Sequence, residues 1–139
     1  MLTHQRVLIV EWGDCDPAGI VYFPRYFEWF DAGTHSLFAM AGLQKAAMLD
    51  AYGIVGIPLV EARARFVRPS TFGDEVIVES SVTAWRRSSF DVQHRLLRGE
   101  ELAVEGFETR VWTARDSHSA SGLKSKAIPR EVVERFARA

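Results

Sequence analysis

The feature that most constrains this fold is one long helical pattern whose apolar face is unusually wide. From Pro24 to Ala41, apolar and aromatic residues recur three and four positions apart, which is the spacing of one face of an α-helix. Pro24 suits a first helical turn and Gly42 the position just past the end, so we expect a helix over 24–41. Because its aromatic side chains must be buried away from water, other elements of the fold must pack around this helix. The face comprises Phe23, Tyr26, Phe27, Phe30, Thr34, Leu37, Phe38 and Ala41.

The remaining patterns predict strands that can supply this cover. A β-branched run predicts a first strand over 7–12, and alternating apolar and polar residues predict strands over 59–67, 76–84, 90–96 and 102–114. A hairpin turn is expected at 98–100. Short helices are expected over 43–52 and 130–138, with a Ser-rich mobile loop over 115–126. The sequence therefore predicts an α+β fold, in which a curved antiparallel sheet wraps around one long apolar helix.

Composition narrows the class of protein. A chain of 139 residues suits one domain, over 1–139, and the formal net charge of -1 gives no reason to expect a nucleic-acid partner. The apolar runs are too short to span a membrane, and the first residues lack a signal-peptide pattern. The single cysteine, Cys15, excludes an internal disulfide. We expect a soluble cytoplasmic protein.

Several blocks of sequence together carry a family resemblance. They read GDCDPAGIV over 13–21 followed by YFPRY over 22–26, GIVGIP over 53–58, EARARF over 61–66, and the segment 79–90 with WRRSSF over 85–90. In this order and spacing the chain resembles the 4-hydroxybenzoyl-CoA thioesterase family of hotdog-fold enzymes, up to about Ala114. The resemblance implies hydrolysis of an acyl-CoA thioester to free acid and CoA. Coenzyme A would be part of the substrate, and no cofactor or metal is expected.

Asp16 is the candidate catalytic residue. Thioester hydrolysis needs a nucleophile or a base that activates water, together with groups that stabilise the oxyanion. No Gly-x-Ser-x-Gly motif is present, whereas a carboxylate in a turn just before a helix lies near free backbone N–H groups. The resemblance makes Asp16 the nucleophile or general base and the backbone N–H of Phe23 the oxyanion donor. The alternative is that Asp14 and Asp16 only shape a turn, and this applies more strongly to Asp14.

The resemblance also implies residues that bind the acyl group. Asp31 would accept a hydrogen bond from the 4-hydroxyl of a benzoyl group, which favours an aromatic substrate, and Tyr22 and Pro24 would contact substrate. The alternative for Asp31 is an ordinary solvated or paired helix carboxylate. Phe23 stands where characterised aromatic enzymes have tyrosine, so only a backbone contact is retained there.

Coenzyme A would be held by Arg86, Arg87 and Ser89, with Pro58 close by. Arginine suits phosphate because its planar guanidinium pairs with two oxygens at once. The alternative is an exposed basic turn.

Other functions remain open at this point. A short- or medium-chain aliphatic acyl-CoA thioesterase is the closest alternative. A hotdog hydratase is disfavoured because Val21 occupies the position where an Asp–His pair would place its histidine. A non-catalytic acyl-CoA or acyl-carrier binding module would not need Asp16. Cys15 is interpreted as a packing residue, and His35 and His94 as packing residues with polar neighbours.

The expected assembly follows from the open edge of such a sheet. Exposed pairing groups favour a homodimer with a continuous sheet, and the family implies two such dimers in a homotetramer with active sites at the dimer interface.

Overall fold

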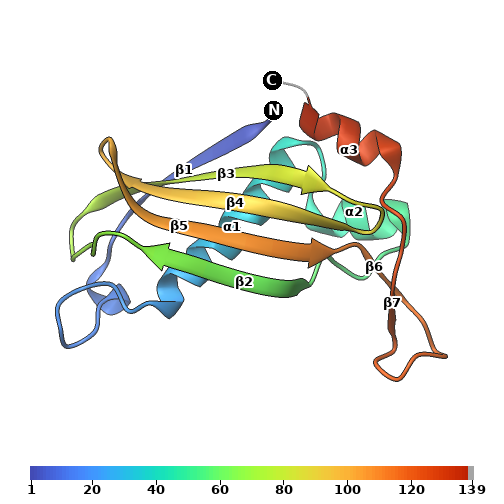
Figure 1. Ribbon diagram of the computed structural model, residues 1–139, viewed down its shortest axis with the longest axis horizontal. Helices are drawn as coiled ribbons and strands as arrows, with labels where there is room; N and C mark the ends of the chain where they lie inside the picture. Colours follow the sequence, from blue (N-terminus) through green and yellow to red (C-terminus); the bar gives the residue numbers. More distant parts are fainter. Residues whose placement is uncertain (138–139) are drawn as a thin grey trace.

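A five-stranded antiparallel sheet wraps around one long helix, α1, in the computed structural model, which describes residues 1–137 (Figure 1). The strands lie side by side in the order β1-β3-β4-β5-β2. This is the α+β hotdog arrangement that the sequence predicts. Its elements are β1 (Thr3–Ile9), the 3-10 turn η1 (Trp12–Asp14), α1 (Pro24–Met40), α2 (Lys45–Tyr52), β2 (Leu59–Phe66), β3 (Glu75–Trp85), β4 (Ser89–Arg98), β5 (Glu101–Val111), β6 (Thr113–Arg115), β7 (Leu123–Ser125) and α3 (Arg130–Ala137).

The core lies between α1 and the concave face of the sheet. The helix buries one face, made of Tyr26, Phe30, Gly33, Thr34, Leu37 and Phe38. Two glycines allow the close approach. A Cβ at Gly33 would lie 2.6 Å from the Ser80 hydroxyl, and one at Gly106 on β5 would overlap the Phe30 ring. The wide apolar face of 24–41 is therefore packed as expected.

Three segments differ from the sequence-based expectation. The first strand is Thr3–Ile9 and not 7–12, because polar residues from Thr3 onward pair with β3, while Trp12 belongs to η1. The expected strand 102–114 ends at Val111, and Thr113–Arg115 turns away to pair with β7. The segment 115–126, expected as a loop, therefore contains β7. The terminal helix is confirmed over Arg130–Ala137, and residue 138 lies outside the described residues.

Strand β2 forms one edge of the sheet and is exposed along nearly its whole length. Only Ala64 among its eight residues is partly buried, and the apolar residues Leu59, Val60 and Phe66 are all more than 40% exposed. Its backbone pairs with β5 on one side only. Such an edge can accept another strand. Among residues 1–137, no helix is both long enough and apolar enough to cross a membrane.

Candidate active site

Asp16 lies in a tight turn whose backbone is fixed on both sides. Its N–H donates to the Ile20 carbonyl at 3.0 Å, and its own carbonyl accepts the Gly19 N–H at 2.9 Å. The Ala18 N–H donates to Asp16 Oδ1 at 2.8 Å, which orients the carboxylate. Within the described chain Oδ2 accepts no hydrogen bond. Asp16 therefore presents one free carboxylate oxygen from a rigid turn.

The neighbouring Asp14 stabilises this turn, in line with the alternative that it only shapes the turn. Its carboxylate accepts the Glu11 N–H at 2.9 Å and lies 3.4 Å from Arg25 Nε. Its carbonyl accepts the Tyr22 N–H at 2.8 Å, which joins the turn directly to the residues that begin α1. Asp14 thus has a structural role, whereas the Asp16 carboxylate is only partly used.

The start of α1 offers an unused backbone donor. Phe23 is the N-cap, Pro24 is the first helical residue, and the Phe23 carbonyl accepts the Tyr26 N–H at 3.1 Å. Among residues 1–137 the Phe23 N–H has no acceptor, and the Phe23 and Tyr22 side chains are about half exposed, at 57% and 50%. A free N–H at the positive end of a helix suits an anionic oxygen.

Two hollows flank these groups at the same end of the molecule. Asp16 lines one of about 260 Å³, whose apolar wall includes the exposed rings of Trp12 and Phe72. Phe23 lines another of about 320 Å³, together with Ile20, Val21, Tyr26, Phe66, Val67, Arg68 and Pro69. Cys15 also borders the first hollow and packs against the core, as its interpretation as a packing residue requires.

Asp31 borders a third, larger pocket of about 410 Å³. The remaining walls are His35, Lys45, Val55, Gly56, Ile57, Pro58, Leu59, Arg110 and Leu123. The structure therefore brings Asp31 and Pro58 together, whereas Tyr22 and Pro24 lie at the start of α1. The Asp31 side chain is 53% exposed and its Oδ1 accepts from Arg110 Nη2 at 2.7 Å. His35 Nε2 lies 3.5 Å from the same oxygen.

The turn between β3 and β4 carries the three residues expected at coenzyme A. Arg86 donates to Ser89 Oγ at 2.8 Å and forms an ion pair with Asp91 at 2.5 Å. The hydrogen bonds from Arg86 lower the pKa of Asp91 below its usual range. Arg87 is exposed, and no partner for its guanidinium occurs within residues 1–137. Arg87 is thus the freer of the two cations.

These groups do not meet within one chain. Figure 1 shows the Asp16 turn and the start of α1 at one end of the sheet, and the β3–β4 turn with the start of β2 at the other. The Asp31 pocket lies at this second end, because Leu59 and Arg110 line it. A site that used all of these groups would therefore have to combine both ends of the sheet.

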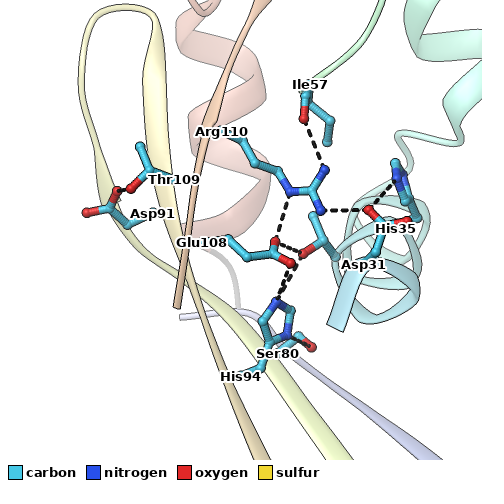
Figure 2. A network of polar contacts seen from close by, with 10 residues as sticks. Asp31, His35, Ile57, Ser80, Asp91, His94, Glu108, Thr109 and Arg110 are labelled. Atoms are coloured by element: carbon cyan, nitrogen blue, oxygen red, sulfur yellow. Dashed lines mark hydrogen bonds and ion pairs between the residues drawn. The ribbon is translucent and has the colours of Figure 1, made fainter. Parts of the chain in front are cut away.

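A buried polar network lies behind the Asp31 pocket (Figure 2). Ser80 Oγ lies 2.7 Å from His94 Nδ1, and His94 Nε2 lies 3.2 Å from Thr34 Oγ1 and 3.3 Å from Glu108 Oε2. The Thr34 hydroxyl donates to Glu108 Oε1 at 2.7 Å, and Arg110 Nε donates to the same oxygen at 2.8 Å. With the Thr34 proton directed at Glu108, His94 Nε2 must carry the proton in that contact. His94 thus has satisfied polar neighbours, as expected.

Glu108 is ionised despite its burial. Desolvation alone would raise the pKa of this carboxyl, but hydrogen bonds from His94 and Arg110 and the Arg110 charge outweigh it and lower the pKa to about 2. Burial also lowers the pKa of His35, against the opposing effect of the Asp31 carboxylate, so this ring is mainly uncharged at neutral pH.

Acid should remove the contribution of Glu108 to stability. Its pKa is depressed from 4.5 to about 2 on folding, so the contribution is complete above about pH 4.5 and is lost as the pH falls toward 2. A shift of this size corresponds to roughly 3 kcal/mol. We expect the urea midpoint to fall across this range, and to fall less in the Glu108→Gln variant. Equal acid dependence in both proteins would contradict the assignment.

Glu108, Arg110 and Thr34 were not predicted from the sequence as network residues. A signal was present, since 104, 106, 108 and 110 alternate along one strand and put a Glu and an Arg on its buried face. Two opposite charges on a buried face usually pair.

Comparison with known proteins agrees with this architecture. The family model of the Thioesterase-like superfamily matches residues 10–136. The 4-hydroxybenzoyl-CoA thioesterase of Pseudomonas sp. (strain CBS-3) is 35% identical over 90% of this chain and 91% of its own length. The 1,4-dihydroxy-2-naphthoyl-CoA hydrolase of Synechococcus elongatus is 30% identical over 69% of this chain and 71% of its own.

A solved structure extends the similarity to three dimensions. The crystal structure of a 4-hydroxybenzoyl-CoA thioesterase variant in complex with 4-hydroxybenzoyl-CoA superposes with a TM-score of 0.89 at 30% identity, covering 98% of this chain and 99% of the other. The chain therefore belongs to the thioesterase-like superfamily, as a hotdog-fold protein related to the 4-hydroxybenzoyl-CoA thioesterases.

Proposed function

We propose that this chain hydrolyses aromatic acyl-CoA thioesters to the free acid and coenzyme A, with Asp16 as nucleophile or general base. The observation that carries the proposal is the link between the Asp16 turn and the start of α1. The Asp14 carbonyl accepts the Tyr22 N–H, and so the free Asp16 oxygen is held in a fixed relation to the unused Phe23 N–H. Fixed geometry between an attacking group and an oxyanion donor is what acyl transfer requires.

The proposed hydrolysis can proceed with the Asp16 carboxylate, the Phe23 N–H and water. Either Asp16 attacks the thioester carbonyl and water then cleaves the mixed anhydride, or Asp16 removes a proton from the attacking water. In both routes the carbonyl oxygen gains negative charge, which the Phe23 N–H and the positive end of α1 stabilise, and the CoA thiolate leaves. The carboxylate and the backbone donor supply the essential groups, and we therefore propose that no metal or organic cofactor takes part.

The proposal includes a homodimer formed through β2. Antiparallel two-fold pairing of β2 with its copy places the Leu59 end of one strand beside the Phe66 end of the other. Leu59 lines the Asp31 pocket and Phe66 lines the hollow at Phe23, so the two hollows of different subunits adjoin. An acyl ring bound near Asp31 in one subunit then reaches the Phe23 N–H of its partner. In the proposed assembly, two such dimers form the homotetramer implied by the family.

The substrate follows from the same pocket. Asp31 presents an acceptor for a ring hydroxyl, and both curated relatives named above act on hydroxylated aromatic acyl-CoAs by their names. We propose that the ring lies near Asp31 and that Tyr22 and Pro24 contact the substrate at the start of α1. Arg87, with Arg86, Ser89 and Pro58, would hold the nucleotide part of coenzyme A, since arginine pairs well with phosphate.

A turnover panel tests this function. Release of CoA would be followed with a thiol reagent on 4-hydroxybenzoyl-, benzoyl-, acetyl- and hexanoyl-CoA. We expect the 4-hydroxybenzoyl thioester to have the highest kcat/KM. Higher values for the aliphatic thioesters would replace this proposal with the short- or medium-chain alternative. No release from any thioester would remove the proposed activity.

Asp31→Ala should reduce kcat/KM for 4-hydroxybenzoyl-CoA by about 10- to 100-fold, the usual value of a hydrogen bond to a charged group. The same variant should change benzoyl-CoA turnover much less. Asp50→Ala, which removes an exposed carboxylate from α2, is the matched control. An equal loss on both aromatic substrates would contradict hydroxyl recognition.

A further inference from the structure

Arg110 connects the buried core to the wall of the Asp31 pocket. Its side chain is 3% exposed, and each guanidinium nitrogen has its own acceptor. Nε donates to Glu108 at 2.8 Å, Nη1 to the Ile57 carbonyl at 3.0 Å, and Nη2 to Asp31 Oδ1 at 2.7 Å. Burial opposes the charged form, but the hydrogen bonds to Glu108 and Asp31 outweigh it and raise the pKa of Arg110 above its ordinary value. The cation is therefore held in place by β5, the α2–β2 connection and α1.

The other end of this network is anchored in the core. Ser80, His94 and Thr34 are fully buried and Glu108 is 5% exposed, so none of them can exchange its partner for water without the fold opening. Phe30 stacks on the His94 ring at 4.8 Å between centroids, with 8° between the planes. Asp31 differs from all of these, because it is half exposed and faces a pocket. The network thus runs from a rigid interior to one accessible carboxylate (Figure 2).

The two carboxylate oxygens of Asp31 have different surroundings. Oδ1 accepts from Arg110 and lies 3.5 Å from His35, whereas Oδ2 has no protein partner among the described residues. An unrestrained aspartate on an exposed helix face would sample several rotamers and point both oxygens to water. Here the hydrogen bond from Arg110 Nη2 holds Oδ1 and leaves Oδ2 without a protein partner on a residue that lines the pocket.

We infer that Arg110 is the positioning residue for acyl-group recognition, and that it fixes Asp31 so that Oδ2 accepts a hydroxyl donated by the acyl ring. This inference rests on the proposed thioesterase function. The ligand class is an acyl thioester whose ring carries a hydroxyl opposite the carbonyl. Arg110 itself touches neither the hydroxyl nor the thioester, and acts through Asp31.

Stability alone does not account for these buried charges. A buried ion pair generally contributes no more to stability than well-packed apolar residues of the same volume, because both ions lose their hydration. A role in positioning gives a reason for a cation here, since the planar guanidinium donates in fixed directions to a core carboxylate, a carbonyl and a pocket carboxylate at once.

The test compares three variants that all carry Glu108→Gln and differ only at Arg110. Glu108→Gln removes the core carboxylate and leaves Arg110 on Asp31, while Glu108→Gln/Arg110→Met also removes the cation, without leaving a buried unpaired carboxylate. For each, the ratio of kcat/KM on 4-hydroxybenzoyl-CoA to that on benzoyl-CoA is measured. We expect the single variant to keep this ratio within about 3-fold of the wild type and the double variant to lower it by about 10-fold or more, mainly through KM for the hydroxylated substrate. Glu108→Gln/Arg110→Lys should recover part of the ratio.

The outcomes are separable. The inference is overturned if Glu108→Gln/Arg110→Met keeps the wild-type ratio. It is also overturned if Glu108→Gln/Arg110→Lys loses kcat/KM equally on both substrates. If the methionine variant does not fold, the lysine variant provides the test. The inference then requires the substrate ratio of Glu108→Gln/Arg110→Lys to be lower than that of Glu108→Gln. A wild-type protein with no turnover of either thioester contradicts the proposed function itself.

Discussion

Asp16→Asn is expected to lower the rate of CoA release by at least about 10³-fold while thioester binding stays measurable. The asparagine side chain keeps an oxygen that can accept the Ala18 N–H, so the turn should retain its shape. It loses the negative charge, and an amide is neither a base for water nor a competent nucleophile at a thioester. Single-turnover rates and calorimetric binding of 4-hydroxybenzoyl-CoA together separate chemistry from binding.

Asp14→Asn is the matched control, because it makes the same change two residues earlier in the same turn. Its side chain can still accept the Glu11 N–H, and we expect only a modest loss of stability, about 1 kcal/mol or less, with most activity retained. If Asp16→Asn kept wild-type turnover, or if both variants lost activity equally, the turn would have a structural role only.

Arg110→Met alone should have the largest effect on stability. It leaves the Glu108 carboxylate buried without its cation, and removing one partner of a buried pair typically costs about 3–5 kcal/mol. Chemical unfolding at neutral pH measures this loss. Adding Glu108→Gln should restore much of it, because a neutral amide is cheaper to bury than a carboxylate.

The sign of the pH dependence gives a second check. Without Arg110, protonation of Glu108 becomes favourable in the folded state, so the deficit of Arg110→Met relative to the wild type should shrink as the pH falls. Arg95→Met is the control, since it removes a partly exposed pair, Arg95 with Glu79 at 3.3 Å, and should cost less than about 1 kcal/mol. A deficit that is constant with pH would show that packing, and not charge, is lost.

The helix and most of the strands could be predicted because each follows a local period. The α1 face from Tyr26 to Phe38 and the alternation in β3 to β5 are dictated by burial alone. The start of β1 could not be located in this way, since Thr3–Arg6 is polar and becomes a strand only through pairing with β3. Pairing of β6 with β7 across a Ser-rich turn likewise depends on contacts between segments.

The residues of the candidate site could be predicted where they lie close together in the sequence. Asp16 and Phe23 lie within one contiguous block, and the structure joins that block through the Asp14 carbonyl. The partner of Asp31 is 79 positions away in Arg110, and no local pattern indicates which helix residue a strand cation will contact. The same limit applies to Thr34 and Glu108, which are 74 positions apart.

The buried network also bears on how this pocket could change its preference during evolution. The two carboxylates of Glu108 and Asp31 both pair with the single guanidinium of Arg110. Substituting Arg110 alone leaves the Glu108 carboxylate buried without its cation, so a single step that removes this cation carries a penalty in folding as well as in substrate recognition. Descendants that have lost Arg110 are therefore expected to have replaced Glu108 as well.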